Sequence, residues 1–316
     1  MAYLNEVWRD GHERCGTATG HPAYHTFRTC AHRANRPHMA YEGYGCLKVR
    51  VEHGVAFVTI DHPPINLFDL PLMQEIERIG RELEADGAVR VVVFDSADPD
   101  FFIAHADVGL IQRLPTEPPP RPTSLGFFHA MVDRFRTMPK ATIAKIEGRA
   151  RGGGSEFVLS LDLRFGALGR AVLAQPEVAL GIIPGGSGTQ RLPRLIGRAR
   201  ALEVILGCED VPADLAERWG YLNRALPPGE LGPFVERLAY RIASFPAEAI
   251  ALAKRAVNAA ERPTVEGLLE EANCFNHSLP TAEARRRMAS FLELGGQTRE
   301  VELQLGGLVE RLQARG

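Results

Sequence analysis

The amino-acid sequence predicts an α/β fold that is followed by a helical C-terminal subdomain. Strand-like and helix-like segments alternate between Leu47 and Leu173, and glycine-rich turns follow several of the strands. Beyond Pro246 the pattern becomes almost wholly helical. A chain of 316 residues, 45% of them hydrophobic, is long enough for one large core and a small accessory region.

Residues 1–40 are predicted to form a mostly disordered N-terminal extension. They contain five of the ten histidines and show no sustained period of 2 or 3.6. A zinc site built on Cys15 and Cys30 is an alternative, but the paired close spacing of zinc modules is missing. A transit peptide is disfavoured by the acidic residues of this segment. A further alternative is that translation begins at Met39, directly before strand-like sequence.

Residues 41–245 contain the alternating pattern. Two short strands, 47–51 and 56–60, flank His53 and Gly54, which is a hairpin signature. Apolar residues at helical spacing follow, and a buried strand comes after them. The remaining predicted elements are a helix at 71–85, a strand at 91–94, a helix at 127–138, a strand at 142–146, a helix at 155–161 and a strand pair at 163–165 and 171–173.

Residues 246–316 are predicted to form the helical subdomain. The expected helices are 247–260, 265–277, 282–292 and 300–314. Between Leu114 and Ser124 five prolines predict an extended or turning loop.

The composition excludes several classes of protein. The formal net charge is −2 and there are only four lysines, so nothing draws the chain to nucleic acid or to an anionic membrane. No stretch reaches the roughly 18 apolar residues that a membrane span needs. The five cysteines are odd in number and widely spaced, which predicts no disulfide framework and a reducing, cytoplasmic location.

Three segments contain the candidate chemistry, and they occur in a fixed order. The first follows a buried strand, the second holds three consecutive glycines, and the third contains an acidic residue before a glycine-rich turn. They are residues 102–108, residues 147–156 and residues 175–192.

In the second segment a predicted strand ends and Gly152, Gly153 and Gly154 open a helix. The N–H groups at a helix start lack intrahelical partners and lie at the positive end of the helix dipole. Glycine lets such a backbone approach a ligand oxygen closely. Gly153 and Glu156 are three residues apart and share one helix face. This pattern predicts an oxyanion donor and a carboxylate in one cavity.

Two other glycine motifs are excluded by a single residue each. Gly181 and Gly186 have the spacing of a phosphate-binding loop, but Ser187 occupies the position of the required lysine. The run from Gly185 to Thr189 has the start of a nucleophile elbow, but it ends in threonine where glycine is needed.

In their order, the three segments resemble the enoyl-CoA hydratase/isomerase (crotonase) superfamily, and the resemblance extends from Leu47 to the C-terminus. It implies a crotonase-like spiral of ββα repeats, capped by C-terminal helices that build homotrimers, often paired into hexamers. It implies an acyl-CoA thioester as substrate, in fatty acid metabolism or a related pathway. Coenzyme A is then part of the substrate, and no separate cofactor, metal or nucleic-acid partner is expected.

The resemblance also implies roles for particular residues. The oxyanion amides would be those of Ala106 and Gly153, the hydratase carboxylates Glu156 and Glu177, and Gly185 would help to hold the reacting water. By analogy, Glu156 is assigned to the water and Glu177 to the proton added at Cα. The expected substrate-binding positions are Ala104, His105, Asp107 and Arg151.

The sequence departs from the family pattern at three places. His105 replaces a glycine, and histidine tolerates an unusual φ less well. It would reach the substrate or CoA, or point to solvent. Arg151 replaces an aliphatic residue and is expected at the CoA phosphates or on the surface. The lysines that often follow Phe291 are absent, so arginines are expected to contact the CoA phosphates.

Other functions remain open at this stage. A double-bond isomerase needs only one carboxylate, and a hydrolase or decarboxylase can use the same scaffold. Some relatives bind RNA through a lysine-rich helix, but the helix predicted at 71–85 has glutamates and no lysine. A catalytically idle scaffold is a further alternative, which the retained glutamate pair disfavours.

Overall fold

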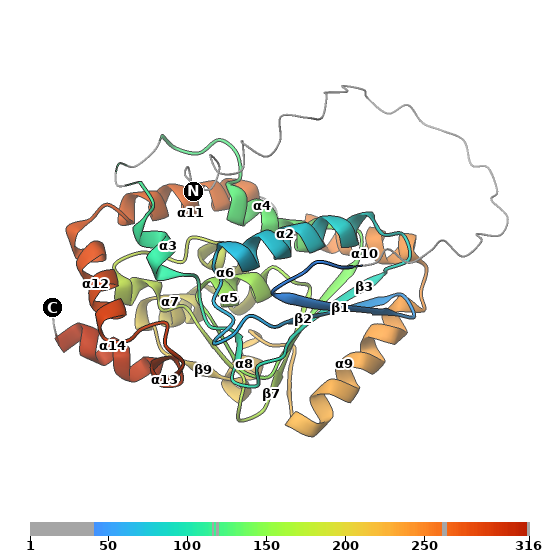
Figure 1. Ribbon diagram of the computed structural model, residues 1–316. Coiled ribbons are helices and arrows are strands. Elements are labelled where there is room, and N and C mark those ends of the chain that lie inside the picture. The colour runs from blue at the N-terminus through green and yellow to red at the C-terminus, as the bar shows by residue number, and fades with distance from the viewer. Residues whose placement is uncertain (1–40, 116, 118–119, 261–263, 315–316) are drawn as a thin grey trace.

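Two β-sheets form the frame on which the helices pack (Figure 1). The structure, a computed structural model, describes residues 41–115, 117, 120–260 and 264–314. The larger sheet has the strand order β1 (Leu47–Glu52), β2 (Val55–Ile60), β3 (Val91–Ser96), β5 (Ala141–Ile146), β7 (Leu163–Ala167) and β10 (Arg224–Leu226). The smaller sheet has the order β4 (Phe101–Ile103), β6 (Arg149–Arg151), β8 (Val172–Ala174) and β9 (Val211–Pro212).

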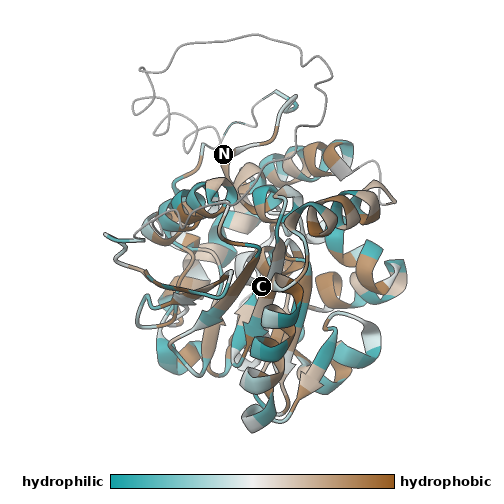
Figure 2. Cartoon of the chain, turned by 90° about the vertical axis from the view of Figure 1, so that its right-hand side faces the viewer, coloured by the Kyte–Doolittle hydropathy of each residue, from teal (hydrophilic) through white to brown (hydrophobic). Residues whose placement is uncertain are grey.

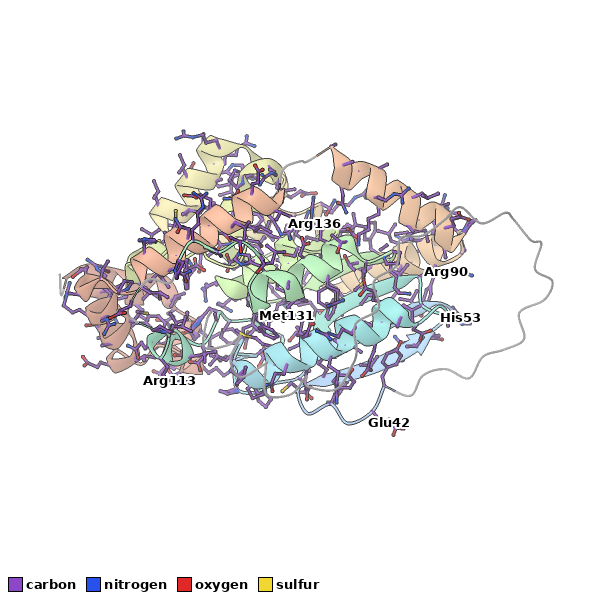
Figure 3. The ribbon with its side chains drawn as sticks, turned by 90° about the horizontal axis from the view of Figure 1, so that it is seen from above. Glu42, His53, Arg90, Arg113, Met131 and Arg136 are labelled. Atoms are coloured by element: carbon purple, nitrogen blue, oxygen red, sulfur yellow. The ribbon has the colours of Figure 1, made fainter. Side chains whose placement is uncertain are left out.

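The predicted hairpin is present at the edge of the larger sheet. β1 and β2 are antiparallel, and Glu52 pairs with Val55 across a two-residue turn. Both turn residues have left-handed backbones, with φ of 49° at His53 and 79° at Gly54. This turn matches the right-handed twist of the two strands. His53 lies at one end of the molecule and Arg113, which follows α3 (Val108–Gln112), lies at the other (Figure 3).

The chain passes repeatedly from one sheet to the other. β3, β5 and β7 lie in the larger sheet, and the strand that follows each of them, β4, β6 or β8, lies in the smaller one. These paired crossings are the spiral of repeats that the resemblance implied. The prediction that 163–165 and 171–173 pair with each other is wrong, because β7 and β8 belong to different sheets. A short turn between two apolar runs does not distinguish a hairpin from such a crossing.

Helices cover both faces of the larger sheet. α2 (Leu70–Ala85) and α4 (Phe127–Thr137) pack on one face, and α9 (Pro228–Ala243) packs on the other through Leu231, Val235 and Ala239. Figure 2 shows that the helices of the molecule carry both brown and teal residues, as expected of helices with one buried face. α9 and three other helices between Gly188 and Ala243 were not predicted; the three are α6 (Gly188–Ile196), α7 (Arg198–Gly207) and α8 (Ala213–Trp219).

Beyond Pro246 the described chain is helical, as predicted. The predicted helix at 300–314 is two helices, α13 and α14, interrupted at Leu303 and Gln304. Most of these helices gather at the end of the molecule where α3 lies (Figure 1), and their apolar residues pack against α3 and the 3₁₀ helix η1 (Glu177–Leu180). The C-terminal helices are α10 (Ala247–Ala259), α11 (Thr264–Ser278), α12 (Ala282–Glu293), α13 (Arg299–Glu302) and α14 (Leu305–Ala314).

Some predictions lie outside the described residues. These include everything expected of residues 1–40, with the zinc site and the start at Met39, and positions 116, 118 and 119 of the proline-rich stretch. Within the described ranges, no helix combines the length and apolar character needed to cross a membrane. The cysteines described there, Cys46, Cys208 and Cys274, are free thiols.

Candidate active site

One cleft brings together the groups that the sequence singled out. Ala106, Gly153, Glu156, Glu177 and Gly185 all line the same cleft of about 620 Å³. They come from the loop after β4, the start and first turn of α5 (Gly153–Leu159), the start of η1 and the loop before α6. The first two of these segments are more than 40 residues apart, and the last two lie close together in sequence, so the spiral of repeats is what brings the groups into one site.

Ala106 lines this cleft and has an amide that the surrounding backbone leaves unpaired. Ala106 forms an isolated parallel bridge with Phe68, in which Phe68 N donates to His105 O at 2.9 Å and Asp107 N donates to Phe68 O at 3.2 Å. The N–H of Ala106 belongs to the same trans peptide unit as the His105 carbonyl and points away from it. Among the described residues it has no hydrogen-bond partner.

The amide of Gly153 is the second unpaired donor. Gly153 begins α5, so its N–H has no intrahelical acceptor and lies at the positive end of the helix dipole. The preceding residue, Gly152, has a φ of 48° and turns the chain from β6 into α5. A Cβ on Gly153 would lie 3.1 Å from the Cβ of Ala106. The two residues that carry these amides therefore lie side by side, and a side chain at position 153 would be crowded.

Glu156 is held by the glycine-rich loop of the third segment. Its Oε1 accepts hydrogen bonds from Gly186 N at 2.7 Å and from Gly188 N at 2.8 Å. A Cβ on Gly186 would lie 2.5 Å from Oε2 of the same carboxylate, so that oxygen is also close to the loop. These two amide donors were missed from the sequence, although Gly185 beside them was predicted. The fixed carboxylate is oriented for chemistry at the cleft.

Glu177 lies on the other side of the cleft. Both glutamates are buried, Glu156 with 4% and Glu177 with 9% of its surface exposed. Burial raises the pKa of Glu156 well above its ordinary value, the charge of Glu177 raises it further, and the amide hydrogen bonds act in the opposite direction. Burial likewise raises the pKa of Glu177, to about 8. Burial and the charge of the neighbouring carboxylate therefore both favour the protonated form of Glu156.

Apart from Asp107, the rest of the cleft is lined mainly by apolar side chains. Its walls include Phe128 of α4 and Phe275 of α11. Met131 of α4 is fully buried core. The other apolar residues of the cleft are Met73, Leu110, Ile111, Leu114, Ile182 and Ile183. Such walls fit an acyl chain next to a polar reaction centre.

Comparison with known proteins identifies the family. The family model described as enoyl-CoA hydratase/isomerase matches residues 50–298. The chain belongs to the enoyl-CoA hydratase/isomerase family.

Several family members are similar along most of their length. The short-chain-enoyl-CoA hydratase of Clostridium acetobutylicum is 33% identical over 244 residues, which are 77% of this chain and 92% of the relative. The crotonyl-CoA hydratase of Syntrophomonas wolfei is 32% identical over 257 residues, 81% of this chain and 96% of the relative. A Streptomyces avermitilis crystal structure, provisionally named an enoyl-CoA hydratase, superposes with a TM-score of 0.79 at 39% identity, covering 87% of this chain and 100% of that one.

His105, which departs from the family pattern, is accommodated without backbone strain. It is not among the described residues with positive φ. Its side chain is 5% exposed, so it does not point to solvent. Its Nε2 lies 3.0 Å from Oε1 of Glu302, and its Nδ1 lies 2.8 Å from Ala106 O. It also lines a second cavity that adjoins Glu177 and Gly153.

The prediction of a surface position for Arg151 is wrong. Its side chain is fully buried, and its guanidinium binds Asp210 in a bidentate pair at 2.7 and 2.6 Å. It also donates to Glu302 O at 2.8 Å and lines neither cavity of the site. Ala104 is buried against Ile65 and lines neither cavity. Asp107, the remaining expected substrate contact, does line the cleft.

Two buried histidine–glutamate pairs lie beside the site, and neither was predicted from the sequence. Glu302 of α13 pairs with His105, and Glu271 of α11 pairs with His129 of α4 at 3.0 Å. Each pair joins residues more than a hundred positions apart in sequence, so spacing offered no signal for either. Among the described residues, no group of three or more His, Cys, Asp or Glu side chains is arranged to hold a metal ion.

Proposed function

We propose that the protein catalyses the addition of water to 2-enoyl-CoA thioesters to give 3-hydroxyacyl-CoA. Its family and its hydratase-named relatives support a lyase-type enzyme. The observation on which the hydratase assignment rests is the shared cleft, where two unpaired amides lie beside two buried glutamates. Isomerisation needs one carboxylate as a proton shuttle, whereas hydration uses both.

In this proposal the thioester oxygen accepts hydrogen bonds from the amides of Ala106 and Gly153. Negative charge develops on that oxygen as water adds to Cβ, and the two fixed donors stabilise it without reorganising. The dipole of α5 acts in the same direction, because Gly153 is at its N-terminus. Loss of one such donor costs about 3–4 kcal/mol in the barrier.

The two glutamates divide the proton transfers. We assign Glu156 as the base that removes a proton from water, because the amides of Gly186 and Gly188 favour its carboxylate form against the larger effect of burial. Glu177 is the acid that delivers a proton to Cα, because its raised pKa keeps it protonated at neutral pH. A proton then returns from Glu156 to Glu177, so the pair ends the cycle as it began.

The test is the loss of the enoyl-thioester absorbance when crotonyl-CoA is mixed with the purified protein. Glu156→Gln and Glu177→Gln should each lower kcat by about 10²- to 10⁴-fold, while butyryl-CoA still binds. Glu209→Gln, at an exposed position, is the matched control and should leave kcat unchanged. Wild-type-like turnover in both active-site variants would dismiss the mechanism.

The same protein incubated with a 3-enoyl-CoA separates hydration from isomerisation. Formation of conjugated 2-enoyl-CoA, faster than any hydration of it, would identify an isomerase. Release of free CoA would identify a hydrolase. We expect neither to compete with hydration.

We also propose that the chain assembles into a homotrimer or a hexamer of two trimers. The surface of α10 supports self-association, because no residue of this helix is buried in the single chain. Leu252 is 46% and Val257 68% exposed there. Light scattering on the purified protein measures the mass directly, and a monomer would refute this part of the proposal.

A further inference from the structure

Residues 297–302 hold both neighbours of Ala106. Glu302 contacts the His105 side chain at 3.0 Å, and Gln297 Nε2 donates to Asp107 Oδ1 at 2.9 Å. These residues lie between α12 and the end of α13, roughly 190 positions further along the chain. Residues 297–302 therefore contact the residue before Ala106 and the residue after it, and the amide of Ala106 is the one that the proposed function uses.

We propose that residues 297–302 position the Ala106 amide, with His105 and Glu302 as a charged positioning pair for the oxyanion site. The inference rests on the proposed function for its effect on turnover. Its geometric core, the orientation of one N–H group, is measurable without any reaction.

The hydrogen bonds of His105 require a charged ring. Nε2 faces the Glu302 carboxylate and Nδ1 faces the Ala106 carbonyl, and both partners are acceptors. Oε1 of Glu302 also accepts from Gln297 N at 2.7 Å, so it acts as an acceptor toward both groups. Since both ring nitrogens must then donate, His105 is an imidazolium.

The electrostatic surroundings favour the same state. Burial is the largest single effect on the pKa of His105 and lowers it. The charge and hydrogen bond of Glu302 and the carbonyl of Ala106 raise the pKa, and the net shift is upward. The charge of Arg151 acts against this upward shift. Burial raises the pKa of Glu302, but the charge and hydrogen bond of His105, together with the Gln297 N–H and the charge of Arg151, hold it below its ordinary value. Across the cleft, His105 lowers the pKa of Glu177, against the larger effect of burial. Glu302, Arg151 and Glu177 are thus the charged or titratable groups that face His105.

The pair acts on the amide through the backbone. The Phe68–Ala106 bridge holds the peptide that carries the Ala106 N–H, since its carbonyl, that of His105, accepts from Phe68 N. The imidazolium holds the next peptide, through Ala106 O. With both flanking peptides fixed, the N–H cannot rotate away from the cleft. A donor fixed before the substrate arrives needs no reorganisation during the reaction.

The direct measurement is the infrared carbonyl band of bound butyryl-CoA, labelled with ¹³C at the thioester carbon. This saturated thioester has no double bond to hydrate. In the wild-type protein the band should lie at lower frequency than in free solution, because two N–H donors polarise the carbonyl. In His105→Gln and Glu302→Gln it should move back toward the free value. Glu300→Gln, an exposed position on the same helix, is the matched control.

Turnover gives the second measurement. With crotonyl-CoA, His105→Gln should lower kcat by on the order of ten- to a hundredfold and change KM by less than about threefold, because the amide matters most in the transition state. The basic limb of its pH–rate profile should move to higher pH, since Glu177 loses a nearby positive charge.

The double variant His105→Gln/Glu302→Gln distinguishes positioning from simple stabilisation. Two neutral amides can still bond to each other, so the protein should fold even if a single variant does not. If the charge of His105 acts on Glu177, the basic limb of the pH–rate profile of the double variant stays at higher pH. The melting temperature of the double variant meanwhile returns toward that of the wild type. Wild-type band position and wild-type pH profile in the folded variants would overturn the inference. A shifted wild-type band without crotonyl-CoA hydration would refute the proposed function and leave the positioning role standing.

Discussion

The two buried histidine–glutamate pairs look alike and differ in what they face. Both join the β-rich part of the chain to a C-terminal helix at 3.0 Å. His105 has acceptors on both ring nitrogens, whereas Nδ1 of His129 has no partner among the described residues. A neutral ring therefore suffices at His129, while His105 needs the second proton.

Their glutamates differ in the same sense. Glu302 bonds to the segment that holds the Ala106 loop, and Glu271 accepts Thr189 N at 2.7 Å, close to the loop that holds Glu156. The negative charge of Glu271 raises the pKa of Glu156, and the positive charge of His105 lowers that of Glu177. In the proposed mechanism one pair supports the oxyanion side and the other the base, and the charges of His105 and Glu271 shift the pKa of Glu177 in opposite directions.

The largest expected effect comes from crowding the carboxylate of Glu156, the proposed base. In Gly186→Ala the added Cβ would lie 2.4 Å from the Phe128 ring and 2.5 Å from Oε2 of Glu156. One of these groups must move, so kcat should fall about a hundredfold or more. Gly207→Ala, where a Cβ meets nothing within 4 Å, is the control and should keep full activity. Equal rates in the two variants would mean that the Glu156 position does not limit turnover.

The next prediction concerns Arg151, which donates to the carbonyl of Glu302 behind the proposed oxyanion site. Arg151→Met should lower the free energy of unfolding by roughly 2–4 kcal/mol, because it leaves Glu302 O without its donor and breaks the pair with Asp210. The KM for crotonyl-CoA should change less than about threefold, since Arg151 lines neither cavity. Arg218→Met, in an exposed pair with Asp214, should cost under about 1 kcal/mol. Urea titrations measure both; a large rise in KM would instead indicate a CoA contact at Arg151.

The wild-type pH profile should be bell-shaped. In the proposed mechanism the active form has one proton on the pair, so activity rises as the first proton leaves and falls as the second does. The basic limb should lie on the alkaline side of neutrality, because burial raises the pKa of both glutamates. A plot of log kcat/KM for crotonyl-CoA against pH measures both limbs. A flat profile between pH 6 and pH 10 would contradict the division of roles.

The smallest expected effect distinguishes the two pairs. Glu271→Gln removes a negative charge that raises the pKa of both catalytic glutamates, so both limbs should move to lower pH. His105→Gln should move the basic limb in the other direction. The same profiles, measured on the two variants, report the sign. Movement of the basic limb in the same direction in both would show that the pairs are not electrostatically opposed.

Much of the local structure followed from the sequence. The hairpin strands β1 and β2 and the helix α2 begin and end within one or two residues of the predicted positions. Period-2 and period-3.6 patterns predict them because these patterns are local properties of the chain. The strand–glycine–helix turn at Gly152 and Gly153 was predicted from the same kind of signal. The pairing of β7 and β8 was mispredicted, since two short apolar runs do not reveal which sheet each joins.

The candidate site divides in the same way. Ala106, Gly153, Glu156 and Glu177 were assigned from the family resemblance of three segments, and they do share one cleft. The exposure of Arg151 was mispredicted because an arginine in a short strand gives no sign of an aspartate partner 59 residues away. Gly186 and Gly188 were not recognised as donors to Glu156, because backbone direction in a loop is not encoded by a periodic pattern.

The sequence by itself determined the alternation of strands and helices, the glycine-opened helix and the family resemblance, since each depends on residues close together in the chain. Only the tertiary structure decided which distant groups meet: Glu302 with His105, Glu271 with His129, and residues 297–302 with the neighbours of Ala106. The physical reason is that such contacts depend on how the sheets and C-terminal helices pack, and the energy of a buried ion pair depends on both partners and on the absence of water around them.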